Sequence, residues 1–80
     1  MNLRLAILTV LNEADLRGAS LPVMTPGVQA QSIAEAWTRS EIASELVRLQ
    51  DEGLVARQRD RIFEQDRYFI TTQGKTLIAR

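Results

Sequence analysis

Two polar sets of side chains offer the clearest chemistry in this chain. Nine of its ten positively charged residues are arginines. A guanidinium stays charged at physiological pH, and its planar fork suits bidentate binding of phosphate. One set combines arginine with serine: Arg39, Ser40, Ser44 and Arg48. The other set consists of arginines alone: Arg57, Arg59, Arg61 and Arg67. These eight residues are the candidate binding residues of the chain.

The chain lacks the residues most often used in catalysis and metal binding, because it contains neither cysteine nor histidine. Their absence removes disulfides, thiolate metal sites, cysteine nucleophiles and imidazole bases. Two carboxylates, Glu41 and Glu45, stand one helical turn apart, but this spacing is more typical of a solvated helix face. We therefore expect no enzymatic activity, no catalytic residue, no cofactor and no bound metal.

Length and composition indicate one ordinary globular unit. Eighty residues, of which 45% are apolar and 25% charged, fit a single domain over residues 1–80. No stretch approaches the roughly 20 apolar residues that span a bilayer. The apolar run from Leu3 to Leu11 contains Arg4 and is followed by no small-residue cleavage site, so a signal peptide is not expected. We expect a soluble, cytoplasmic protein with no membrane partner.

The best-defined element is a helix over residues 39–52. Thr38 and Glu41 have the spacing of a capping box, in which each side chain accepts from the backbone N–H of the other residue. Gly53 can take the left-handed conformation that ends a helix. Between these ends, an apolar face is predicted from Ile42, Leu46 and Leu49. The polar residues of this stretch, including the first candidate set, face away from it.

Two earlier helices are expected. The first covers residues 2–14, where apolar residues recur at helical spacing. Residues 15–25 form a connection with a short extended piece at residues 21–24. The start of the second helix stays open, because Thr25 before Pro26 offers one cap and Ser32 with Glu35 offers another. Its apolar stripe consists of Ala30, Ile33, Ala34 and Trp37. We assign Trp37 to the core rather than to base stacking or partner binding.

The second and third helices are separate elements. Continuing the stripe of Ile33 and Trp37 by helical steps reaches only polar residues, so the apolar face jumps near Thr38. A turn at that point predicts a tight helix-turn-helix unit. After it, residues 54–59 and 65–71 predict a hairpin with its tip at residues 60–64, in a register that the pattern leaves open. Thr72 is expected to cap a last helical turn, residues 73–80, whose Leu77 and Ile78 return to the core.

The order of these elements and two motifs resemble winged-helix regulators of the MarR, ArsR and PadR type. The first motif is the run Leu46-x-x-Leu49-x-x-x-Gly53-Leu54-Val55. The second is the ending Ile70-Thr71-x-x-Gly74. The resemblance covers nearly the whole chain. The opening residues 3–8 and the length are also similar to small winged-helix proteins of Mu-like prophages.

The resemblance implies an α+β winged helix-turn-helix fold, with a three-helix core, a two-stranded hairpin wing and a short C-terminal helix. It also implies a transcriptional regulator that binds double-stranded DNA. In that arrangement the third helix, residues 39–52, faces the major groove, and the wing, residues 54–71, faces the backbone or the minor groove. All eight candidate residues then become DNA-binding residues.

The charge balance favours a second interpretation. The net charge is zero, and residues 38–52 carry two arginines against four acidic residues. Residues 54–67 carry four arginines against three acids, so the arginines of the wing can pair with neighbouring carboxylates. DNA-binding domains usually show a basic stripe. The alternative is a winged-helix module that contacts a protein partner, such as a phage or replication accessory factor, without binding DNA. A homodimer through the first helix or the last turn is expected if DNA is bound.

Overall fold

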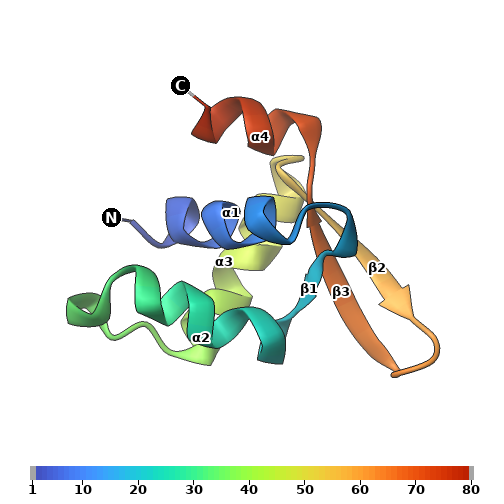
Figure 1. Cartoon of the computed structure of the whole chain (residues 1–80), viewed down its shortest axis with the longest axis horizontal. Coiled ribbons are helices and arrows are strands. Elements are labelled where there is room, and N and C mark those ends of the chain that lie inside the picture. Colours follow the sequence, from blue (N-terminus) through green and yellow to red (C-terminus); the bar gives the residue numbers. More distant parts are fainter. Residues whose placement is uncertain (1, 80) are drawn as a thin grey trace.

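The computed structural model describes residues 2–79, which fold into four α-helices and a three-stranded antiparallel sheet (Figure 1). The order is α1 (Leu3–Ala14), the 3-10 turn η1 (Asp15–Arg17), β1 (Ala19–Ser20), α2 (Leu21–Gln31), the 3-10 turn η2 (Ile33–Glu35), α3 (Arg39–Asp51), β2 (Val55–Asp60), β3 (Gln65–Ile70) and α4 (Thr72–Ile78). The helices gather on one side, and the β2–β3 hairpin projects from them. This arrangement confirms the predicted α+β class.

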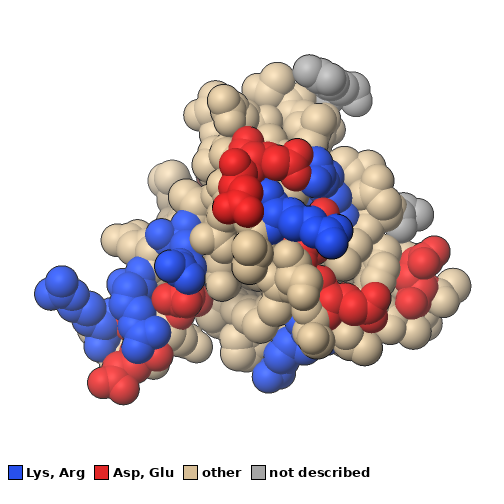
Figure 2. Space-filling view, turned by 180° about the vertical axis from the view of Figure 1, so that it is seen from behind, with Lys and Arg blue, Asp and Glu red and all other residues tan. Residues whose placement is uncertain are grey.

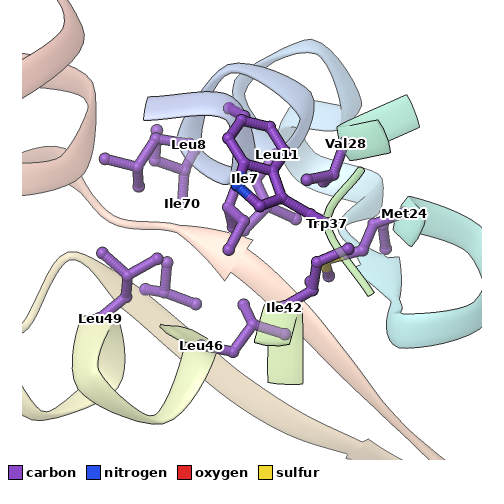
Figure 3. Packing of buried hydrophobic residues seen from close by; sticks show 13 residues of the cluster. Ile7, Leu8, Leu11, Met24, Val28, Trp37, Ile42, Leu46, Leu49 and Ile70 are labelled. Carbon is purple, nitrogen blue, oxygen red and sulfur yellow. The ribbon is translucent and has the colours of Figure 1, made fainter. Parts of the chain in front are cut away.

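Helix α1 is the centre of the core, because it packs against α2, α3, α4 and β3. Its residues Ile7, Leu8 and Leu11 have no solvent exposure. Side chains from the other elements complete the cluster around them: Ala19, Met24, Val28, Trp37, Ile42, Leu46, Leu49, Val55 and Ile70 (Figure 3). Trp37 is 8% exposed, which confirms its assignment to the core.

The expected extended piece at residues 21–24 is wrong. The strand β1 comes earlier, where Ala19 pairs with Tyr68 and Ser20 with Arg67 across to β3. Leu21 already begins helix α2. Pro22 explains the change, because its fixed φ is preorganised for the first turn of a helix and its missing N–H is not needed there.

Both expected starts of the second helix are also wrong. Helix α2 runs from Leu21 to Gln31, so that Pro26 lies inside it. The burial of Met24, Thr25 and Val28 outweighs the hydrogen bond that Pro26 cannot donate. The hydroxyl of Thr25 does not cap the helix but donates to the carbonyl of Leu21, at 2.6 Å.

The expected apolar stripe of this helix is wrong except for Trp37. Ile33 is 84% exposed, and Ala30 and Ala34 are exposed as well. The chain leaves the helix at Ser32, forms η2, and turns at Ala36, which has a left-handed φ of 51°. The connection between α2 and α3 is therefore the irregular segment 32–38, longer than the tight turn that the phase jump predicted.

Helix α3 has the N-terminal capping box and the terminating glycine that the sequence predicted. The N–H of Glu41 donates to Oγ1 of Thr38 at 3.1 Å, and the N–H of Thr38 donates to Oε1 of Glu41 at 3.0 Å. Gly53 adopts a φ of +76°. The helix ends at Asp51 with Glu52 as its C-cap, one residue before the predicted limit.

The hairpin that follows is close to the prediction. Strands β2 and β3 pair from Val55 opposite Ile70 to Asp60 opposite Gln65, which settles the register. Thr71 rather than Thr72 caps α4. Its Oγ1 accepts from the N–H of Gly74 at 3.1 Å and donates to the carbonyl of Gly53 at 2.7 Å.

Helix α4 returns the chain to the core, as expected. Leu77 and Ile78 are half-buried and pack against the core cluster. The helix ends at Ile78, and the predicted limit at Arg80 lies outside the described residues.

Candidate nucleic-acid interface

The outer face of α3 carries the first candidate set. Arg39, Ser40, Ser44 and Arg48 are all exposed, whereas the opposite face of the helix is buried through Ile42, Leu46 and Leu49. Three of the four form one row, because residues four apart are neighbours on a helix surface. Ser40, Ser44 and Arg48 line a shared hollow together with Leu3, Glu41 and Glu45. Arg39 lies in the first turn beside this row.

Carboxylates accompany that row. Glu45 is 13% exposed and lies 3.5 Å from the guanidinium of Arg48 and 3.4 Å from Nε of Arg4 on α1. Arg4 also donates two hydrogen bonds to the carboxylate of Glu52, one of them at 2.8 Å. The bond to Glu52 raises the pKa of Arg4, and burial opposes that rise. Arg4 therefore offsets part of the negative charge on this side of α3.

The second candidate set is distributed along the hairpin, and three of its members pair with acids. Asp66 lies 3.7 Å from Arg57 and 3.7 Å from Arg59. Arg67 lies 3.0 Å from Asp60. These pairs are the cross-strand ion pairs expected from the charge balance. On the face toward the viewer in Figure 2, basic and acidic side chains intermingle and form no continuous basic stripe.

Two of the wing arginines, Arg67 and Arg61, differ in how many contacts they make with the rest of the chain. Arg67 is half-buried and also donates to the backbone carbonyl of Arg17, at 3.3 Å, so it ties the hairpin to the turn after α1. We regard it as a structural residue. Arg61 is exposed and makes no ion pair within residues 2–79. Of the wing arginines, Arg61 would therefore lose the fewest contacts on binding a phosphate.

Tyr68, the neighbour of Arg67 on β3, has a perturbed ionisation. Burial raises the pKa of Tyr68, and the charge of Asp66 adds to that rise while Arg57 opposes it. The side chain is half-buried against the core and lies opposite Ala19 of β1. Its position on β3, the central strand of the sheet, suits packing rather than proton transfer.

The tip of the hairpin holds two residues that the sequence analysis did not select. Ile62 is 85% exposed and Phe63 is 66% exposed. They stand between Asp60 and Glu64, and the available signal was this apolar pair inside an otherwise polar loop. Large apolar side chains at the far end of a hairpin cannot reach the core.

Within residues 2–79, no three carboxylate, histidine or cysteine side chains come together in a way that could hold a metal ion. No helix of the same part of the chain has the length and apolar character required to cross a bilayer.

The architecture matches solved structures of one kind. No protein-family model matches the chain, and no curated protein matches it. A MarR family transcriptional regulator from Silicibacter pomeroyi superimposes with a TM-score of 0.80 at 22% identity, over 98% of this chain and 47% of that one. A second MarR family transcription regulator gives a TM-score of 0.71 at 27% identity, over 96% of this chain and 46% of the other.

These matches identify the fold. The chain has a winged-helix fold of the MarR type, as its motifs predicted, with α2 and α3 as the helix-turn-helix and β2–β3 as the wing. It spans about half the length of the two solved structures that it matches.

Proposed function

We propose that this chain binds double-stranded DNA as a winged-helix transcriptional regulator. In this proposal α3 faces the major groove, and the β2–β3 hairpin follows the backbone or enters the minor groove. The observation that carries the proposal is the two-sided character of α3. Its apolar face is wholly buried while its arginine and serine face is open to solvent. The two similar solved structures are both described as transcription regulators, which supports it.

The exposed row on α3 suits a groove. A major groove about 12 Å wide admits an α-helix, and the first turns of that helix usually meet the base edges. Arg39 and Ser40 occupy the first turn, and Ser44 and Arg48 follow along the row. Arginine can donate two bonds to guanine, and serine is less selective. Arg48 must leave Glu45, which lies 3.5 Å away; because the Arg48 side chain is 74% exposed, this pair is worth about 1 kcal/mol.

In this proposal the wing arginines bind the phosphates of the DNA backbone. Arg57 and Arg59 share a single carboxylate, that of Asp66, at 3.7 Å each, so a phosphate can replace it at low cost. Arg61 is available without any exchange. These three residues supply positioning contacts, whereas the α3 row would supply selectivity.

A dimer is part of the proposal, because one small module buries little DNA surface and two half-sites raise the affinity. Sedimentation equilibrium should show a species of twice 9.0 kDa at binding concentrations. A monomer at every concentration tested would remove this part of the proposal.

One set of observations favours a protein-contact module instead. The net charge is zero, and Arg57, Arg59 and Arg67 are all paired with acids. Neutralising phosphates supplies most non-specific DNA affinity. A winged helix without a basic surface would then contact a protein.

Fluorescence anisotropy with random duplex DNA across a salt series separates the two functions. The variant Arg59→Glu with Arg61→Glu removes positive charge from the wing. A matched control, Arg17→Glu with Lys75→Glu, makes the same change in net charge at exposed positions in η1 and α4. We expect wild type and control to bind with a log-log salt slope of roughly −3 to −6, and the wing variant to show a flatter slope. Absence of binding at low salt would favour the protein-contact module.

The role of α3 needs a separate experiment. Once a preferred duplex has been selected from a random pool, Arg39→Ala should weaken binding to it by about 1 to 3 kcal/mol and relax the preference at one position. Binding to random DNA should change much less. An equal loss on both duplexes would assign Arg39 to phosphate contact.

A further inference from the structure

The tip of the wing has an unexplained composition. Ile62 and Phe63 are adjacent and exposed, and neither belongs to the core cluster nor packs against it. Single exposed apolar residues are ordinary on protein surfaces. Here, however, two large ones occupy the point of the molecule that projects farthest along the hairpin, where folding gains nothing from them.

The tip is also held in a defined shape. Oδ1 of Asp60 accepts from the N–H groups of Ile62 and Phe63 at 3.0 and 3.3 Å, and its Oδ2 receives Arg67 at 3.0 Å. Glu64 takes a left-handed φ of 48° to close the turn. The two apolar side chains are therefore presented on a braced turn rather than on a loose loop.

Positive charge flanks this apolar tip. A hollow on one side of the hairpin is lined by Arg59, Arg61 and Arg67 together with Ile62. Asp60, in the same hollow, is neutralised by its pair with Arg67. Glu64 is exposed and remains the one acid of the turn that would oppose a phosphate.

We propose that Ile62 and Phe63 form an apolar wedge that enters the DNA minor groove and partly unstacks a base step, while Arg59 and Arg61 contact the flanking phosphates. This inference rests on the proposed DNA-binding function. An apolar side chain between base steps is a known means of bending the duplex. The wedge also explains how a chain with zero net charge can gain affinity for DNA. Apolar insertion supplies affinity that does not depend on counterion release.

A wedge predicts a preference for deformable DNA. Pyrimidine–purine steps such as TA unstack easily, whereas A-tracts are stiff. A duplex of about 20 base pairs with a central TA step should therefore bind more tightly than an A-tract duplex of the same composition. Charge alone would not distinguish the two.

The test uses the TA duplex with a fluorescent adenine analogue at that step, whose emission rises on unstacking, and with dyes at both ends that report bending. The variant Ile62→Ser with Phe63→Ser removes the wedge and keeps every charge. Leu16→Ser is the matched control, because Leu16 is 88% exposed in η1, outside the wing. Phe63→Leu keeps an apolar tip and should retain part of the signal.

We expect wild type and Leu16→Ser to raise the emission and bend the duplex. The double serine variant should lose both signals and bind about tenfold more weakly with an unchanged salt slope. Binding by wild type without unstacking or bending would overturn the wedge and leave the DNA-binding proposal standing. Absence of binding to any duplex would overturn both. A change in self-association of the double variant at equal DNA affinity would assign the tip to a second copy of the chain and also overturn the wedge.

Discussion

Helix α3 and the β2–β3 hairpin each carry four candidate residues, yet the fold holds them in different ways. Three side chains of α3 enter the core, and none of them is more than 1% exposed: Ile42, Leu46 and Leu49. In the hairpin, only Val55 and Ile70 at the base are fully buried, and the side chains of β3 before Ile70 are half-buried. Beyond the base, the strand ladder and a few ion pairs maintain the shape.

This difference separates stability from binding. The outward row of α3 cannot be displaced without disturbing the core, because one helix carries both faces. The hairpin can change its charge or its tip while the core stays intact. Substitutions on the buried face of α3 should therefore affect the whole molecule, whereas substitutions on its exposed face and most substitutions in the wing should affect contacts alone.

The largest effect is expected at the inner face of α3. Leu46→Ala removes a side chain that is 1% exposed and leaves a cavity between α3 and the core. We expect a loss of about 2 to 5 kcal/mol in the free energy of unfolding, most of the stability of a domain this small. Urea unfolding followed by circular dichroism measures it. Val47→Ala, next along the chain and 57% exposed, is the control and should change stability by less than about 0.5 kcal/mol.

The base of the wing gives the next largest effect. A Cβ at Gly74 would lie 2.5 Å from the carbonyl oxygen of Leu54 and 2.7 Å from Cγ1 of Ile70, so Gly74→Ala should cost about 1 to 3 kcal/mol. Gly27 is also helical, but a Cβ there meets Val10 at an ordinary 3.5 Å. Gly27→Ala should therefore stabilise by about 0.4 to 1 kcal/mol. Thermal unfolding compares the two, and equal shifts in the same direction would contradict the close packing at Gly74.

A smaller effect is expected from the charge on the wing. Asp66→Asn frees Arg57 and Arg59 and should tighten binding to random duplex DNA severalfold, with a steeper salt slope. Unfolding free energy should change by less than about 1 kcal/mol, since these are surface pairs. Glu13→Gln makes the same charge change on the exposed surface of α1 and is the control. If both variants tighten binding equally, net charge rather than the wing carries the contact.

The smallest effect concerns Tyr68. Its raised pKa in the folded protein means that the unfolded chain loses the phenolic proton first as pH rises above about 10. The stabilisation associated with this shift is complete below that pH and is lost as pH rises through the folded pKa. Urea midpoints at about pH 8 and pH 10.5 should fall less in Tyr68→Phe than in wild type. Equal decreases would show that the phenol ionises as freely in the fold as in the unfolded chain.

Prediction from sequence succeeded where the signal was local. The ends of α3 follow from Thr38, Glu41 and Gly53, which act over a few residues through hydrogen bonds and a backbone conformation. The two segments predicted as strands, residues 54–59 and 65–71, likewise correspond closely to β2 and β3. For the candidate site, the exposure of the α3 row followed from the helical period alone.

Prediction failed where the local sequence was compatible with two different structures. Thr25 before Pro26 suits a helix start as well as Pro22 does, and burial of Met24 and Val28 decided between them. At the wing, the count of acids predicted ion pairs, but the structural role of Arg67 depends on the carbonyl of Arg17, distant in the sequence.

The sequence by itself determined the limits of α3, its inner and outer faces, the hairpin and the absence of cysteine and histidine chemistry, because each of these depends on residue type or short-range spacing. Only the tertiary structure decided where α2 begins, that β1 pairs with β3, and which charges neutralise one another. These features depend on contacts between distant segments, whose energies appear only when the core brings them together. The exposed apolar tip belongs to both: its residues are plain in the sequence, but their isolation from the core is a property of the fold.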